Sequence, residues 1–289
     1  MTQPAARTSR RDSREVVELK ELGIAHPELE SAVAMQLALM EVQRRIQGRV
    51  PLPWIQSDAD WLAAQQRAGR PIVRFGDIPL NWSDFRLTFR QTADILYRYE
   101  ALDRTEHQEI LTLGRDGHRL EPLVSQWYQA TAGVEPGMNP SDRAPAGSPA
   151  SLDQVLVLAL RPFLARCAEA LVQSVDPKIW RYGHCPFCGW EPEFACIMPS
   201  AERRLVCGRC LAQWAFDALA CPFCANADRS LVTSFATRDG RYRVYACDVC
   251  RRYLKAYDGR HSTRPVLVSV DAIATLPLDA AAMQRGYVG

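Results

Sequence analysis

Residues 185–190 read CPFCGW, and the same pattern of two cysteines separated by two residues returns three more times before residue 251. The eight cysteines of these pairs are Cys185, Cys188, Cys207, Cys210, Cys221, Cys224, Cys247 and Cys250. A two-residue gap forms a turn that points both sulfur atoms at one place, so two facing turns make a tetrahedral sulfur cage. The repeated pattern therefore predicts that this part of the chain binds metal ions.

The gaps between the pairs indicate how the pairs combine. A gap of 18 residues follows the first pair and a gap of 22 residues follows the third, and each is long enough for one β-hairpin. The middle gap of 10 residues suits a connection between two sites. We therefore expect the first two pairs to form one four-cysteine site and the last two to form another. Such all-sulfur sites suit iron or zinc, and we expect two metal ions, iron or alternatively zinc.

Alternative roles for the cysteines and their neighbours are less favoured. Two redox-active dithiols would each need the βαβ context of a thioredoxin-like motif, which the pattern here lacks. The two remaining cysteines, Cys167 and Cys196, are expected to be buried apolar residues. His184 is expected to stay outside the coordination sphere, because a closed structural site takes four ligands.

The overall composition fits a soluble globular protein. The chain has 289 residues, of which 47% are hydrophobic, and a formal net charge of +2. A dedicated nucleic-acid binder carries a stronger basic excess, so the charge argues against nucleic acid as a partner. No apolar run follows Arg10 and Arg11, and none reaches the roughly 18 residues of a membrane span. We therefore expect a cytoplasmic protein without membrane insertion, in which paired cysteines indicate metal binding rather than disulfides.

The periodicity of apolar residues divides the chain into a helical part and a β-rich part. We predict an α+β fold, with an N-terminal all-helical domain followed by two small rubredoxin-like or zinc-ribbon metal modules and a C-terminal helix. The expected segments are a disordered basic tail (1–25), a helical domain (26–132), a flexible linker or loop (133–150), a helical segment (151–176), a first four-cysteine ribbon (177–218), a second (219–270) and a C-terminal helix (271–289).

Individual residues suggest where these elements begin, bend and turn. Ser57, Ser83 and Ser151 each stand where a helix N-cap is expected. Pro162 should kink the helical segment or divide it into two helices, because proline lacks a backbone donor. Asp239-Gly240 predicts a tight hairpin turn, since glycine tolerates a positive φ.

The metal-binding part of the chain has a small basic excess. Residues 178–264 hold 14 Lys or Arg and 8 Asp or Glu, and two divalent four-thiolate sites would offset about four of the excess charges. We predict a partner-binding face between the ribbons, formed by exposed Trp214, Arg251 and Arg252. A double zinc-ribbon nucleic-acid-binding protein would also use aromatic and basic side chains, but the weak charge makes it the lesser alternative.

Several stretches together resemble the formate dehydrogenase accessory proteins of the FdhE family. These stretches are CPFCGWEP (185–192), CGRCLAQW (207–214), CPFC (221–224), CDVCRRYLKAY (247–257) and DAIATLPLD (271–279). In addition, ALRPFLARCAEAL at 159–171 is similar to the helix that precedes the first cysteine pair in that family. The resemblance covers roughly residues 155–288.

The resemblance implies a maturation factor rather than an enzyme. Proteins of this family act in the cytoplasm, contact the catalytic subunit of formate dehydrogenase before export and are needed for its activity. The resemblance also implies that the eight paired cysteines are metal ligands, and it associates iron with rubredoxin-like sites. A rubredoxin-like electron-transfer protein is the alternative, although three of the four pairs lack the glycine that follows Cys188.

Overall fold

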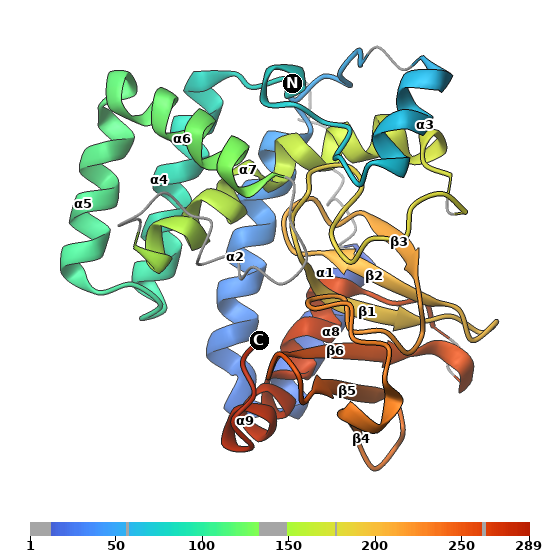
Figure 1. Ribbon diagram of the computed structural model, residues 1–289. Helices are drawn as coiled ribbons and strands as arrows, with labels where there is room; N and C mark the ends of the chain where they lie inside the picture. The colour runs from blue at the N-terminus through green and yellow to red at the C-terminus, as the bar shows by residue number, and fades with distance from the viewer. Residues whose placement is uncertain (1–12, 56–57, 133–148, 177, 262–263) are drawn as a thin grey trace, which may run out of the picture.

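The computed structural model describes residues 13–55, 58–132, 149–176, 178–261 and 264–289. A helical N-terminal part packs against a C-terminal part that is built on one β-sheet (Figure 1). The predicted α+β class, with a helical part followed by two four-cysteine clusters and terminal helices, is confirmed. Within the described ranges, no helix has both the length and the apolar character needed to cross a membrane.

Seven helices are described in the N-terminal part. They are α1 (Arg14–Ala25), α2 (Glu30–Gln47), α3 (Ala59–Arg67), α4 (Trp82–Arg98), α5 (Arg104–Arg115), α6 (Gly117–Thr131) and α7 (Ala150–Leu171). Short 3-10 turns lie in this part at Pro27–Leu29, Phe75–Asp77 and Val172–Ser174, and in the C-terminal part at Arg229–Leu231 and Gly259–His261. Helix α4 packs against α2, α5 and α7, and the rings of Phe85, Phe89 and Phe163 meet in this core.

Residues 14–25 were expected to lie in a disordered tail, but they form helix α1, so that prediction is wrong for this segment. Leu19 on α1 is fully buried and packs in one cluster with Val33 of α2 and Val270. The apolar side chains of this segment repeat at helical spacing between many charged residues, and burial of that narrow stripe stabilises the helix. Residues 1–12 lie outside the described part of the chain.

Two helices begin at a different capping residue from the one predicted. Asp58 caps α3, and its side chain accepts a hydrogen bond from a backbone N–H of the first turn. Asn81, rather than Ser83, caps α4 in the same way. Asp and Asn are as good as Ser at this position, so neighbouring candidates compete and the geometry of the chain decides. Ser57 lies outside the described residues.

Helix α7 continues without interruption through Pro162. The alternative of two separate helices is therefore wrong. Pro162 and the flanking Leu160 and Phe163 are all buried in the helical core, and this packing offsets the loss of one backbone hydrogen bond. Pro149 occupies the N-cap position, so Ser151 lies inside the helix rather than at its cap. Most of the predicted linker, residues 133–148, lies outside the described part of the chain.

The two predicted ribbons merge into a single six-stranded sheet. Its strands are β1 (Pro192–Ile197), β2 (Arg203–Cys207), β3 (Gln213–Phe216), β4 (Val232–Ala236), β5 (Tyr242–Cys247) and β6 (Tyr253–Asp258), in the order β3-β2-β1-β6-β5-β4. Each ribbon supplies three antiparallel strands, and β1 pairs in parallel with β6 at the junction. The two ribbons therefore lie side by side in the same orientation.

The predicted hairpin turn at Asp239-Gly240 is confirmed. Gly240 has a φ of 69° between β4 and β5, and the N–H of Thr237 donates to the carbonyl of Tyr242 at 2.9 Å. A positive φ costs glycine nothing, since glycine has no side chain to clash with the backbone.

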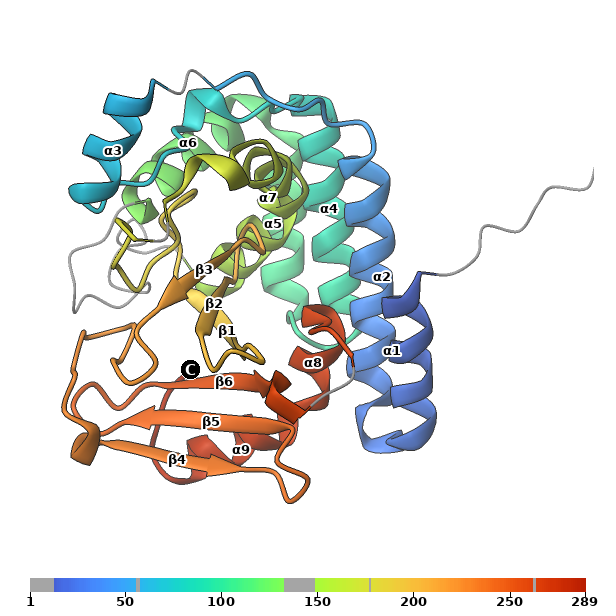
Figure 2. The same cartoon turned by 90° about the vertical axis from the view of Figure 1, so that its right-hand side faces the viewer.

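The sheet is covered on both faces. On one face, Phe194, Val206 and Tyr257 pack toward the C-terminal helices α8 (Val268–Ala274) and α9 (Leu276–Gln284). In Figure 2, α9 lies behind β4 and β5, and α8 stands beside the end of β6, next to α1 and α2. On the other face, side chains such as Leu205 and Leu254 join the main core, which continues into the helical part. The tail was expected to be one helix over 271–289, but it forms two, because Pro277 favours a new helix start.

Candidate metal centres

All four Cys-x-x-Cys turns have the same backbone hydrogen bonds. In the first turn, the N–H of Cys185 donates to the carbonyl of Trp190 at 2.8 Å, and the N–H of Gly189 donates back to the carbonyl of Cys185 at 3.0 Å. The other three turns repeat both bonds, with distances between 2.8 and 3.1 Å. Two bonds fix each loop, so both cysteines of a pair are held on the same side of the turn.

The residue after the second cysteine of each pair has a positive φ. The values are 72° for Gly189, 61° for Leu211, 59° for Ala225 and 59° for Arg251. Residues other than glycine rarely adopt this conformation, because Cβ then crowds the backbone. The missing glycines noted in the sequence therefore do not prevent the turns from forming. They leave three of the four turns strained, and the surrounding structure must supply the compensating stabilisation.

The first cluster, site 1, consists of Cys185, Cys188, Cys207 and Cys210. The Sγ atoms of Cys185 and Cys210 are 3.5 Å apart, and those of Cys188 and Cys207 are 3.4 Å apart. All four side chains are buried. The first two cysteines precede β1, and the last two form the turn between β2 and β3.

The second cluster, site 2, consists of Cys221, Cys224, Cys247 and Cys250. The Sγ atoms of Cys221 and Cys250, and those of Cys224 and Cys247, are each 3.7 Å apart. Cys224 and Cys250 are only half-buried, in contrast to every cysteine of site 1. Site 2 is therefore the cluster that lies nearer to solvent.

The geometry of both clusters fits a tetrahedral metal ion. A metal–sulfur bond of about 2.3 Å places neighbouring sulfur atoms about 3.8 Å apart, close to the distances between the paired Sγ atoms. In each cluster the four ligand atoms all lie within 4.8 Å of one another, and none of these cysteines forms a disulfide. Each cluster could thus hold one ion, and four sulfur donors suit iron and zinc alike. The structure gathers the cysteines into the same two groups as the spacing predicts.

A buried arginine connects site 1 to the helical part. Arg209 lies in the turn between Cys207 and Cys210 and is fully buried. Its guanidinium group lies over the rings of Tyr128 at 4.6 Å and Trp190 at 4.7 Å, and its Nη1 donates to Thr131 Oγ1 at 3.0 Å. Tyr128 and Thr131 belong to α6, so the arginine ties the metal turn to that helix.

The charge of Arg209 affects the thiols around it. Burial alone would raise the pKa of Cys188, but hydrogen bonds from the neighbouring thiols and the adjacent Arg209 hold that pKa well below its usual range. Burial raises the pKa of Cys185 and of Cys210. A metal ion that binds at site 1 must therefore displace the protons that burial favours on Cys185 and Cys210.

One known protein is similar to this chain in sequence, and another is similar in fold. A protein from Aquifex aeolicus (strain VF5) named FdhE homolog is 27% identical over 138 residues, which are 46% of this chain and 48% of that protein. The crystal structure of the FdhE protein from Pseudomonas aeruginosa matches 96% of this chain and 94% of its own chain, with a TM-score of 0.63 and 20% identity. The chain has the FdhE fold. No family model matches it.

The resemblance to FdhE proteins that the cysteine motifs indicated is therefore confirmed. The motifs that carried it lie between residues 155 and 288, whereas the FdhE fold covers 96% of the chain and so includes the helical part. The sequence match is shorter, since it spans about half the length of the curated relative.

The three predicted partner contacts have very different positions. Trp214 is only 4% exposed, and its Nε1 donates to the carbonyl of Tyr182 at 3.1 Å. Arg252 is 8% exposed and pairs with Glu191. The expectation that these two side chains are exposed is therefore wrong. Trp214 lies on the edge strand β3 and packs into the main core, whereas Arg252 is held beside Glu191. Arg251 is exposed, as predicted, and its guanidinium group lies over the ring of Tyr287 at 4.2 Å.

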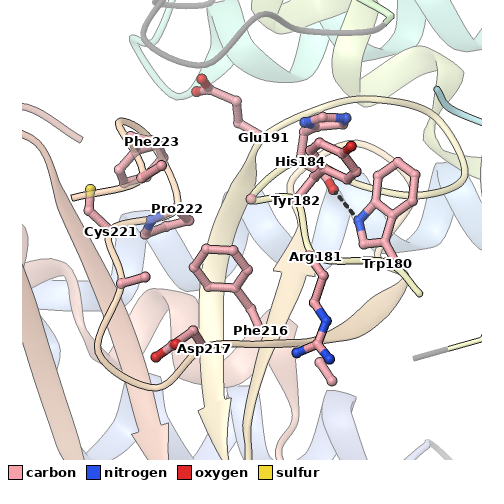
Figure 3. A pocket seen from close by; sticks show the side chains of 14 residues that line it. Trp180, Arg181, Tyr182, His184, Glu191, Phe216, Asp217, Cys221, Pro222 and Phe223 are labelled. Carbon is pink, nitrogen blue, oxygen red and sulfur yellow. Dashed lines mark hydrogen bonds between the residues drawn. The ribbon is translucent and has the colours of Figure 1, made fainter. Parts of the chain in front are cut away.

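A cavity of about 460 Å³ lies between the segment that precedes site 1 and the first turn of site 2. Trp180, Tyr182 and His184 line one side, and Pro222 and Phe223 line the other (Figure 3). The sequence contains no local signal for this cavity, because its walls come from two segments that are far apart in the chain and meet where the two ribbons join.

The other cysteines and His184 lie outside both clusters, as predicted. Cys167 on α7 and Cys196 on β1 are buried, and burial raises the pKa of each thiol to about 12. His184 is also buried, with its Nε2 2.9 Å from the carbonyl oxygen of Gly69. Its role is to attach the segment before Cys185 to the helical part.

Proposed function

We propose that this chain is a cytoplasmic accessory factor that binds the catalytic subunit of a formate dehydrogenase and is needed for the maturation of that enzyme. It acts by binding and not by catalysing a reaction. The observation that carries the proposal is the FdhE fold over nearly the whole chain, combined with two four-cysteine clusters.

The eight cysteines are assigned as ligands of two metal ions, iron or alternatively zinc. Site 1 has a structural role, because its cysteines are buried and Arg209 attaches it to α6. Site 2 belongs to the partner-binding side. The half-buried Cys224 and Cys250 bring this site close to the surface, where a docked protein would cover it.

Of the residues predicted to contact a partner, Arg251 keeps that role. Its side chain is exposed directly after Cys250. Trp214 and Arg252 instead have structural roles, since both are buried.

Copurification tests this proposal. Under anaerobic conditions, a tagged catalytic subunit should enrich the protein over an unrelated bait. Replacing Cys224 and Cys250 with serine should abolish the enrichment, because site 2 then loses two ligands. The matched control is Cys196→Ser, a buried cysteine outside both clusters, which should still be captured. If the wild-type protein is not enriched, the proposed partner is wrong.

The position of site 2 also favours a second candidate function, electron transfer. A metal ion beside the half-buried Cys224 and Cys250 would lie near the surface, as a redox centre must to exchange electrons with a partner. This function requires iron at site 2. Anaerobically purified native protein should then be red and show a reversible redox wave. A colourless protein that contains only zinc would exclude it.

A further inference from the structure

A second, smaller cavity of about 120 Å³ lies beside site 2. Its lining includes Cys221 and Cys247 together with largely apolar side chains such as Val232, Tyr245 and Leu254. It is distinct from the larger cavity, although both use the turn at Pro222.

Arg203, the first residue of β2, lines this cavity and is only 4% exposed. Its Nη1 donates to the carbonyl of Ala220 at 3.0 Å, and its guanidinium group lies over the ring of Tyr245 at 5.2 Å. These two contacts hold the group in place. Its Nε and Nη2 atoms are buried and have no hydrogen-bond partner among the residues that the structure describes.

The two unpartnered nitrogens define the kind of ligand. Nε and Nη2 form one edge of the guanidinium plane, and their parallel N–H groups match the two oxygens of a carboxylate. A buried guanidinium group with unsatisfied N–H donors costs free energy. A ligand that accepts hydrogen bonds from both N–H groups would therefore bind favourably here. Because the other contacts of Arg203 already fix its orientation, this edge is prepared before the ligand arrives.

The surrounding charge favours an anion. Arg229 also lines the cavity, and its side chain makes no ion pair within the described ranges. Arg252 is the third arginine of the lining, but its charge is matched by Glu191. The described lining contains no aspartate or glutamate. Of site 2, Cys221 and Cys247 line the cavity, and neither sulfur atom is within hydrogen-bond distance of the free edge of Arg203.

We propose that this cavity binds a carboxylate, with Arg203 as the bidentate donor and Arg229 as a second positive charge. The apolar walls and the small volume fit a short aliphatic chain behind the carboxylate. The carboxylate comes either from a free small molecule or from an acidic side chain of a protein. The inference does not depend on the proposed function, and its test needs no partner protein.

Saturation-transfer NMR with isobutyrate tests the proposal on the full-length, metal-loaded protein. Isobutyrate should bind, whereas isobutyramide, which has the same shape without the charge, should not. Arg203→Gln should weaken binding about ten- to a hundredfold, since a bidentate charged contact is lost. The matched control is Arg204→Gln, an exposed arginine on the neighbouring position of β2 that pairs with Glu202. It should leave binding unchanged.

Two further variants test the proposal without removing the buried charge of Arg203. Arg229→Gln changes an exposed side chain and should weaken isobutyrate binding several-fold through the loss of one charge. Arg203→Lys keeps the positive charge but lacks the two parallel N–H donors of the guanidinium group, so it should bind isobutyrate more weakly than the wild type does. The proposal is wrong if isobutyrate gives no signal, if isobutyramide binds equally well, or if Arg229→Gln and Arg203→Lys both bind as the wild type does.

A comparison of two ligands distinguishes the two sources of the carboxylate. N-acetyl-glutamate N-methylamide carries a carboxylate in the setting of a protein side chain. Tighter binding of this compound than of isobutyrate would point to an acidic side chain of a protein. The reverse order would point to a free small carboxylate.

Discussion

Glu191 and Arg252 form a buried, bidentate ion pair that joins the two metal modules. Arg252 Nη1 is 3.0 Å from Glu191 Oε1, and Arg252 Nη2 is 2.7 Å from Glu191 Oε2. Glu191 follows the first turn of site 1, and Arg252 follows the last turn of site 2. Both residues are 8% exposed, so neither charge has water to replace a lost partner.

Removing one partner of this pair should destabilise the protein strongly. Glu191→Ala should lower the free energy of unfolding by about 3 kcal/mol, because it leaves Arg252 buried without a counter-charge. Glu191→Leu combined with Arg252→Met should cost less than Glu191→Ala alone. Denaturant unfolding of the metal-loaded protein measures both. The control is Glu202→Ala, which breaks an exposed pair worth less than about 1 kcal/mol. Equal losses for Glu191→Ala and Glu202→Ala would contradict this interpretation.

A close backbone contact places the two sites side by side. A Cβ atom on Gly183 would lie 1.9 Å from the carbonyl oxygen of Pro222, inside the first turn of site 2. Gly183→Ala should therefore push this turn away, lower the stability by about 3 kcal/mol and weaken metal binding at site 2. Thermal unfolding and competition with a chelator measure the two effects. Gly76→Ala is the matched control, since its Cβ meets nothing within 4 Å. If the two variants behave alike, the contact does not position site 2.

Relief of strain in the first turn of site 2 should stabilise the protein. Ala225 has a φ of 59°, so Ala225→Gly should raise the free energy of unfolding by about 1 kcal/mol. Ala227→Gly is the control nearby, where φ is not positive. That change should instead lower stability by about 0.5 kcal/mol, because glycine gains freedom in the unfolded chain. A loss of stability in both variants would show that the positive φ at Ala225 carries no strain.

The two sites should lose metal in a fixed order. Cys224 and Cys250 are half-buried, whereas all four cysteines of site 1 are buried, so a chelator should remove the ion of site 2 first. Alkylation during chelation, followed by mass spectrometry, should therefore label Cys224 and Cys250 before Cys185 and Cys188. Labelling at equal rates, or labelling of site 1 first, would contradict the assignment of site 2 as the exposed site.

The two cysteine clusters are the part of this protein that can be predicted most completely from its sequence. The gap between Cys185 and Cys188, and the hairpin that leads to Cys207, are local features, so spacing alone groups the eight cysteines correctly. Local turn chemistry likewise predicts the hairpin at Gly240. In both cases the information lies within a short stretch of chain.

Features that depend on distant contacts could not be predicted. The pairing of Ala195 in β1 with Ala256 in β6 merges the ribbons, and no residue near either position signals it. Trp214 and Arg252 were expected to be exposed because of their residue types. The burial of Arg252 follows from this merging, which brings Glu191 within its reach. Trp214 lies on the edge strand β3 and is instead buried by its packing into the main core.

The metal content of the native protein tests the central claim most directly. Anaerobically purified protein should contain two iron or zinc ions per chain, with X-ray absorption showing four sulfur neighbours at about 2.3 Å around each ion. In the folded protein the eight cluster cysteines should resist alkylation until the metal is removed. A fully folded, metal-free protein with eight freely reactive thiols, whose stability does not change on chelation, would contradict the account.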